Sequence, residues 1–244
     1  MGYTVKTLTL GALFDTTFDL LQKHWRILLV INGVALVPFY LVFVAVYVWG
    51  ADWINSNPYW FVETPSWLFF FLVFALGGFF LALYATGAAV VKGVCKIYLD
   101  QPVTVAACYE AVWNKAGPLI WATSLAGLFT LLGYCLLFVP GLILQLMFFV
   151  LVPVIMLESV TGIDSLKRSR DLMRGEKGKA FFFLILVGIV WSLVDFVVKF
   201  IPNHFVHIAA SSLFHLLFVV FTNVGTVIFY LQAKAGKENL LTGP

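Results

Sequence analysis

Long apolar runs broken by short polar stretches dominate the pattern of this chain. A helix needs about 20 apolar residues to cross the hydrocarbon core of a bilayer. Residues 27–49 and 67–91 meet this requirement, and neither run contains a charged side chain. The stretch between them is rich in Asn, Pro and Trp, which is typical of a loop at a membrane surface. The pattern therefore predicts two membrane-spanning helices joined by a loop.

Residues 116–157 form one uncharged run of 42 residues, too long for one span and about right for two. Pro140 and Gly141 lie within this run. Because proline interrupts a helix and glycine permits a tight turn, we expect the chain to reverse there. Two further apolar runs follow, so the pattern predicts six spans. They are residues 27–49, 67–91, 118–139, 142–157, 180–201 and 205–233.

Three shorter segments repeat apolar residues with helical spacing, and each precedes a pair of spans. Their apolar positions are Leu10, Phe14, Phe18 and Leu21; Val105, Cys108, Tyr109, Val112 and Trp113; and Ile163, Leu166 and Met173. Polar and charged residues occupy the other faces, a pattern typical of helices that lie along a bilayer surface. We expect an all-α integral membrane protein, a single polytopic domain over residues 1–244, with six transmembrane helices and three interfacial amphipathic helices on the cytoplasmic side.

Composition supports the membrane assignment. Hydrophobic residues make up 62% of the chain and the mean hydropathy is +0.99, more apolar surface than one soluble core buries. The net charge of only +3 argues against nucleic-acid binding, which needs many exposed cations. The three cysteines lack the spacing of a zinc site or a disulfide framework. We therefore expect membrane lipids as partners, and no metal or other cofactor.

The distribution of Lys and Arg predicts the orientation of the chain. If the N-terminus is cytoplasmic, six spans place 14 of the 15 Lys and Arg residues on the cytoplasmic side and only Lys199 on the other. Cytoplasmic loops of membrane proteins are enriched in these residues. We therefore expect a multi-pass protein of the cytoplasmic (inner) membrane with both termini in the cytoplasm.

The basic segment after the fourth span contains the first candidate site. Glu158 ends that span, ten residues before Arg168. A carboxylate at this depth favours a cationic partner, so we expect an ion pair with Arg168 or Arg170, with direct substrate contact as the alternative. Arg170 shares a face with Leu166, so it either extends to headgroups or turns inward to Glu158. The cations of this segment also attract anionic headgroups.

The fifth and sixth spans contain the other ionisable candidates. Asp195 and Lys199 are one helical turn apart, which favours mutual neutralisation over a functional role. His204, His207 and His215 share one face of the sixth span with Ser211. This face either makes helix-helix hydrogen bonds or lines a path for protons or a polar solute. A metal site at Asp195, His204 and His207 lacks recognisable ligand spacing.

Several stretches resemble the bacterial and archaeal membrane domains related to that of glycerophosphoryl diester phosphodiesterase. They are "LGALFDTTFDLLQKHWRILLVINGVALVP", "FVPGLILQLMFFVLVPVIMLES" and "SLKRSRDLMRGEKGKAF". The sharpest matches are Pro140, Gly141, Pro153, Glu158 and the run Arg168, Ser169, Leu172 and Gly175. The resemblance implies a six-helix integral membrane protein without a catalytic motif to transfer, and we expect no phosphodiesterase domain in this chain.

Three function classes follow from these observations. The sequence has no GxSxG, HExxH or phosphate-binding loop, so we do not expect an enzyme. We expect a non-enzymatic inner-membrane protein that organises lipid or assists another membrane process. One alternative is a small transporter or channel for a proton or polar solute that uses Asp195 and the histidine face. The other alternative is a membrane-embedded lipid enzyme, which would need a nucleophile or an acid pair at the interface.

Overall fold

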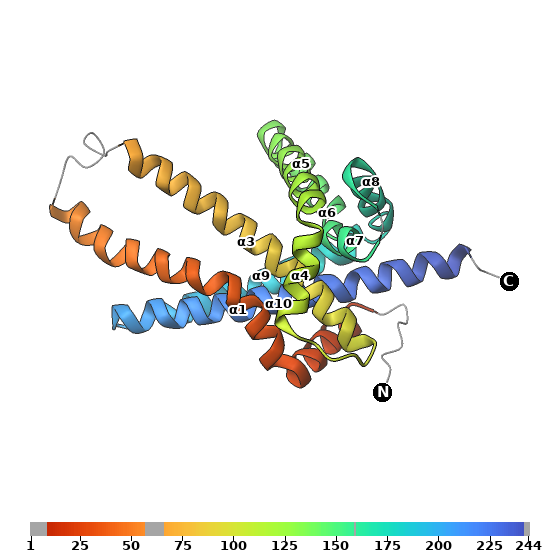
Figure 1. Ribbon diagram of the computed structural model, residues 1–244, viewed down its shortest axis with the longest axis horizontal. Coiled ribbons are helices and arrows are strands. Elements are labelled where there is room, and N and C mark those ends of the chain that lie inside the picture. The colour runs from red at the N-terminus through yellow and green to blue at the C-terminus, as the bar shows by residue number, and fades with distance from the viewer. Residues whose placement is uncertain (1–8, 57–65, 159, 242–244) are drawn as a thin grey trace.

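A computed structural model describes residues 9–56, 66–158 and 160–241, and all regular structure within these ranges is helical (Figure 1). The helices are α1 (Leu10–Ser56), α3 (Ser66–Tyr98), α4 (Val105–Asn114), α5 (Ala116–Leu136), α6 (Phe138–Met147), α7 (Leu151–Leu157), α8 (Gly162–Leu172), α9 (Lys177–Val198) and α10 (His204–Leu241). The predicted all-α fold class is confirmed.

Six stretches of helix are long and apolar enough to cross a membrane, as predicted. They are Leu10–Val42, Gly77–Tyr98, Ala116–Leu136, Phe138–Leu157, Lys177–Val198 and Val206–Lys237. The chain is therefore a multi-pass membrane protein. Helices α4 and α8 are short and lie between spans, where the sequence predicts interfacial helices.

The first interfacial segment continues into the first span and is separated from it by a kink. His24 has non-helical backbone angles (φ −124°, ψ 19°) within α1. Figure 1 shows α1 changing direction between its N-terminal part and the rest of the helix. Leu13, Thr17 and Leu20 form the buried stripe of residues 10–23, which we call the N-terminal segment. Of the four positions of the predicted apolar stripe, Leu10, Phe14 and Leu21 are partly buried and Phe18 is 64% exposed. Apolar side chains also face lipid, so apolar spacing alone does not identify the protein-facing side.

The reversal between the third and fourth spans lies at Leu137, not at Pro140 and Gly141 as predicted. Leu137 is extended (φ −161°, ψ 151°), and α6 begins at the next residue. Pro140 lies in the first turn of α6, where its missing N–H costs no helical hydrogen bond. Gly141 instead allows α5 and α6 to pack closely, because a Cβ there would lie 2.8 Å from the Tyr134 backbone nitrogen.

The fourth span is a broken helix. Helix α6 ends at Met147 and α7 begins at Leu151. In α7, Pro153 has no N–H with which to bond the Phe149 carbonyl, so a continuous α-helix would leave that carbonyl without its usual partner. The break therefore leaves backbone acceptors in the apolar part of the chain that other groups must satisfy.

Helix α10 packs against both α1 and α9 and forms part of the main core. Gly225 lies where α9 and α10 cross, since a Cβ at this position would come within 2.5 Å of the Phe183 ring. Asn223 Nδ2 donates to Oδ1 of the fully buried Asn32, joining α10 to α1 across 3.1 Å. Small residues and buried amides of this kind hold membrane helices together where the hydrophobic effect between helices is weak.

Candidate functional site

Glu158 ends α7 and forms a bidentate ion pair with α8. Its backbone is extended (φ −101°, ψ 159°), which stops the helix. Arg168 Nε donates to Oε2 at 2.8 Å, and Arg168 Nη2 donates to Oε1 at 3.2 Å. The Glu158 side chain is only 11% exposed and the Arg168 side chain is 35% exposed. The structure therefore brings together two residues that the sequence analysis proposed as partners.

Helix α10 adds two groups to the same carboxylate. Tyr230 donates its hydroxyl hydrogen to Glu158 Oε1 at 2.9 Å, and Lys234 Nζ lies 3.7 Å from that oxygen. Burial raises the pKa of Glu158, but the hydrogen bonds from Arg168 and Tyr230 and the charges of Arg168 and Lys234 outweigh it. The pKa of Glu158 is therefore below its usual value, and the carboxylate is ionised at neutral pH.

Lys115, at the corner between α4 and α5, caps the C-terminus of α7. Its Nζ donates to the carbonyl oxygens of Ile155 at 2.7 Å, Met156 at 3.3 Å and Glu158 at 3.3 Å. These are carbonyls that the end of a helix leaves without intrahelical partners, and a cation there also opposes the helix dipole. Burial lowers the pKa of Lys115, and the nearby charge of Lys92 lowers it further.

We call Lys115, Glu158, Arg168, Tyr230 and Lys234 the Glu158 cluster. It joins α7, α8, α10 and the α4–α5 corner at one end of the spans. Sequence analysis missed Lys115, Tyr230 and Lys234. The available signal was weak: Tyr230 and Lys234 are one helical turn apart at the end of the sixth span, and Lys115 is a cation at the start of the third.

Two further contacts fix α8 to its neighbours. The hydroxyl of Ser169, itself buried, donates to the Met147 carbonyl at 2.9 Å and so satisfies an acceptor at the break in the fourth span. Lys237 Nζ donates to the Asp171 carbonyl, which ties the end of α10 to α8. Leu166, Leu172 and Met173 are buried on the same side. Helix α8 is therefore held on its inner side by packing, hydrogen bonds and an ion pair.

The outer side of α8 and the turn after it present three exposed cations, Lys167, Arg170 and Arg174, which we call the basic face. Lys167 pairs with Asp164 at 3.0 Å, and Arg170 lies 3.6 Å from Asp171. Arg170 extends outward and does not turn inward to Glu158, because the Glu158 carboxylate is already paired with Arg168. Gly175 ends this region with φ +92°, a conformation that glycine adopts without strain.

The second candidate pair lies at the C-terminal end of α9, with Lys199 as the residue that follows the helix. Lys199 Nζ is 2.9 Å from Asp195 Oδ2, and the two side chains are 66% and 32% exposed. This geometry fits mutual neutralisation. His215 packs edge-on against the rings of Tyr40 (5.7 Å between centroids) and Trp191 (4.8 Å).

His207 is half-buried, and the side chain of His204 lies outside the described part of the structure. Among the described side chains, no three His, Cys, Asp or Glu residues gather as ligands for a metal ion. The structure therefore does not join Asp195 and the described histidines into one cluster.

Comparisons of this chain with protein-family models, with curated proteins and with solved structures find no match. A function for this chain must therefore be argued from its own structure, and the Glu158 cluster with the basic face beside it is the best-defined feature.

Proposed function

We propose that this chain is a non-enzymatic membrane protein that binds anionic lipid headgroups at its basic face, and thereby organises lipid or assists another membrane process. The observation that carries the proposal is the attachment of α8. Arg168 and Ser169 hold one side of this helix to the spans, so Lys167, Arg170 and Arg174 project from the other. A helix held in this way loses little conformational entropy when a headgroup binds.

The magnitude of the attraction supports this proposal. Each Lys or Arg near an anionic membrane surface contributes about 1 kcal/mol of binding free energy. The neighbouring carboxylates Asp164 and Asp171 offset part of it. A basic face of three cations is therefore sufficient to enrich anionic lipid locally, but not to hold one lipid irreversibly.

We further propose that the protein resides in the cytoplasmic (inner) membrane with both termini in the cytoplasm. With six spans, this orientation places 14 of the 15 Lys and Arg residues on the cytoplasmic side. The basic face would then meet the cytoplasmic leaflet, where anionic lipids give a negative surface potential.

We also propose that this chain is related to the membrane domain of glycerophosphoryl diester phosphodiesterase. Four of the residues on which the resemblance rests have structural roles here, and these roles support the proposal. Glu158 and Arg168 form the ion pair, Ser169 bonds the broken span, and Gly175 has a positive φ. These residues are used to attach α8, which is a structural role that a family of membrane domains would share.

The test compares two exposed cations that each lie beside a carboxylate. Wild-type protein, Arg170→Gln and Lys199→Gln are reconstituted in vesicles of phosphatidylglycerol and phosphatidylcholine in equal amounts. Lipid that remains bound after release into mild detergent is measured by native mass spectrometry. We expect Arg170→Gln to lower retained phosphatidylglycerol by about threefold, and Lys199→Gln to leave it unchanged.

Equal retention by all three proteins would overturn lipid binding at the basic face. Phospholipid breakdown by the wild type in the same vesicles, lost in Glu158→Gln, would overturn the non-enzymatic assignment.

A further inference from the structure

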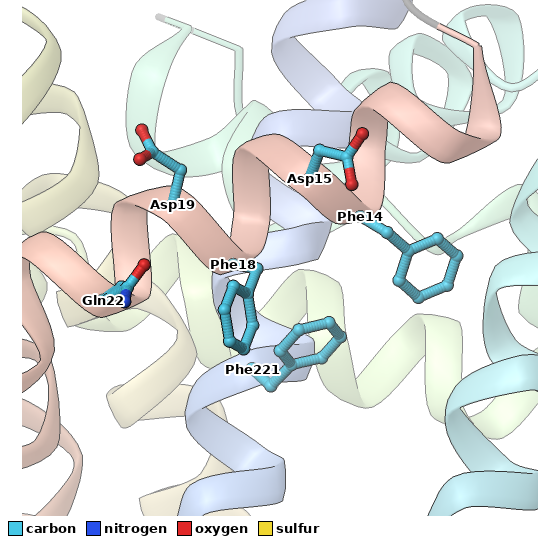
Figure 2. Close-up of a pocket in the computed structure, with 6 residues that line it drawn as sticks. All are labelled: Phe14, Asp15, Phe18, Asp19, Gln22 and Phe221. Atoms are coloured by element: carbon cyan, nitrogen blue, oxygen red, sulfur yellow. The ribbon is translucent and has the colours of Figure 1, made fainter.

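An open groove of about 360 Å³ lies beside the N-terminal segment of α1, away from the Glu158 cluster. Its lining consists of Phe14, Asp15, Phe18, Asp19, Gln22 and Phe221. Figure 2 shows the three phenyl rings gathered along one edge of the helix and the two carboxylates projecting from the other edge. The groove thus has an apolar side and an acidic side.

The helical positions of these residues explain the two sides. At 100° per residue, Leu13, Thr17 and Leu20 face the protein, and they are buried. The phenyl rings of Phe14 and Phe18 occupy the next sector, and Asp15 and Asp19 the sector after that. An interfacial helix with such sectors directs its phenyl rings toward acyl chains and its carboxylates toward headgroups.

Contacts with the spans place the groove at the depth of an interface. The Phe14 ring lies 5.3 Å from the ring of Phe183 and 6.2 Å from that of Phe221. Phe183 is six residues after the start of α9 at Lys177, which corresponds to about 9 Å along the helix. An interfacial helix buries its apolar face by about 5–10 Å. The groove therefore lies where the first carbons of an acyl chain meet the headgroup.

The charge of the acidic side selects among lipids. Asp19 already pairs with Lys23 at 2.8 Å. Asp15 is exposed and makes no ion pair or side-chain hydrogen bond within the described part of the chain. An anionic headgroup is repelled here, whereas a primary ammonium group can both neutralise Asp15 and donate hydrogen bonds to it.

We propose that this groove binds one phospholipid with a primary-amine headgroup, such as phosphatidylethanolamine, from the adjacent leaflet. Its acyl chain lies against Phe14, Phe18 and Phe221, and its ammonium group pairs with Asp15. A choline headgroup carries the same charge without an N–H donor, so it binds less well. The site shares no residue with the basic face, so this proposal and the proposed function fail or succeed separately.

The test places a photoreactive benzoyl-phenylalanine at Phe18 in the full chain. The matched control carries it at Phe182, which is 56% exposed and lies one residue from Phe183, near the same depth. Vesicles contain phosphatidylethanolamine, phosphatidylcholine and phosphatidylglycerol in equal amounts, and crosslinked lipids are identified by mass spectrometry. We expect about threefold enrichment of phosphatidylethanolamine at Phe18, the scale that a partly exposed ion pair supplies, and none at Phe182.

Asp15→Asn should abolish the enrichment, and Asp15→Glu should retain it. Because Asp15 is exposed, both variants should melt at the wild-type temperature. Equal crosslinking of the three lipids at Phe18, or an enrichment that survives Asp15→Asn, would overturn the proposal. Enrichment of phosphatidylglycerol instead would show that the groove does not select an amine. If the probe at Phe18 prevents folding, Gln22 on the same face carries it and the same outcomes apply.

Discussion

At the scale of residues, Glu158 shows which contacts a sequence reveals. Its pairing with Arg168 could be predicted because the two lie ten residues apart across one short connection. Its contact with Tyr230 spans 72 residues, and that of Lys115 with Ile155 spans 40. Nothing in the local pattern links such distant positions. The same limit applies to Asn32 and Asn223, whose hydrogen bond joins helices at opposite ends of the chain.

Removing the Glu158 carboxylate should show how much the Glu158 cluster contributes to the stability of the protein. Glu158→Gln should destabilise the protein by about 2 kcal/mol, less than for a fully buried pair because Arg168 is 35% exposed. With Arg168→Gln in addition, the loss should be smaller than the sum of the single losses by about 1 kcal/mol. Thermal unfolding in detergent measures all three variants. Strict additivity would contradict the ion pair as a source of stability.

The lowered pKa of Glu158 also predicts how the stability loss in Glu158→Gln depends on pH. The pKa of Glu158 is lowered in the folded protein, so its contribution is fully present above the ordinary glutamate pKa of about 4.3. It is lost as the pH falls through the lower, folded-state pKa. The stability gap between wild type and Glu158→Gln should therefore be constant near neutrality and close in acid. Asp19→Asn, which breaks an exposed pair, serves as the control and should change stability by less than about 1 kcal/mol.

At the scale of elements, helix type and number could be predicted better than helix ends. Apolar runs identify spans because bilayer thickness fixes their length. The reversal at Leu137 and the break after Met147 depend on how two segments pack, as the contact between Gly133 and Gly141 illustrates. In the N-terminal segment, both the protein and the lipid accept apolar side chains. The sequence therefore indicates an amphipathic helix but not which way Phe18 faces.

The break in the fourth span provides a test at this scale. Ser169→Ala should remove the hydrogen bond to the Met147 carbonyl and destabilise the protein by about 1–2 kcal/mol, since the acceptor lies in an apolar region. Hydrogen exchange should also rise locally at residues 148–151. The matched control is Ser192→Ala, whose exposed hydroxyl bonds to the Gly188 carbonyl of its own helix. A loss of equal size in both variants would contradict the proposed role of Ser169.

At the scale of the whole molecule, the helices follow one another as three units. Each unit has an interfacial helix and then two spans: the N-terminal segment with the rest of α1 and α3, α4 with α5 and the broken α6–α7 helix, and α8 with α9 and α10. This order could be predicted because long apolar runs mark the spans and amphipathic segments mark the helices between them. The way in which α10 contacts both α1 and α9 could not, because packing between spans leaves little trace in apolar sequence.

The proposed orientation has a direct test. Reporter fusions after Gln101 and Gly175 should report a cytoplasmic location, and fusions after Leu137 and Asn203 should report the opposite side. The expectation follows from the positive charges that six spans collect on one side. A cytoplasmic signal after Asn203 would overturn the six-span topology and with it the location of the basic face.

The hydrogen bond from Ser169 to Met147 has a consequence for biosynthesis. A nascent chain emerges from its N-terminus, so the break in the fourth span leaves the ribosome before Ser169, which lies 22 residues after Met147. The partners of Glu158 on α10 follow later, because Tyr230 is 72 residues further along the chain and Lys234 is beyond it. A chain halted before α10 would contain Arg168 and Ser169, but it would lack the Tyr230 hydroxyl and the Lys234 charge that lie against Glu158. A product truncated before α10 therefore leaves the largely buried Glu158 carboxylate with fewer partners than it has in the complete fold.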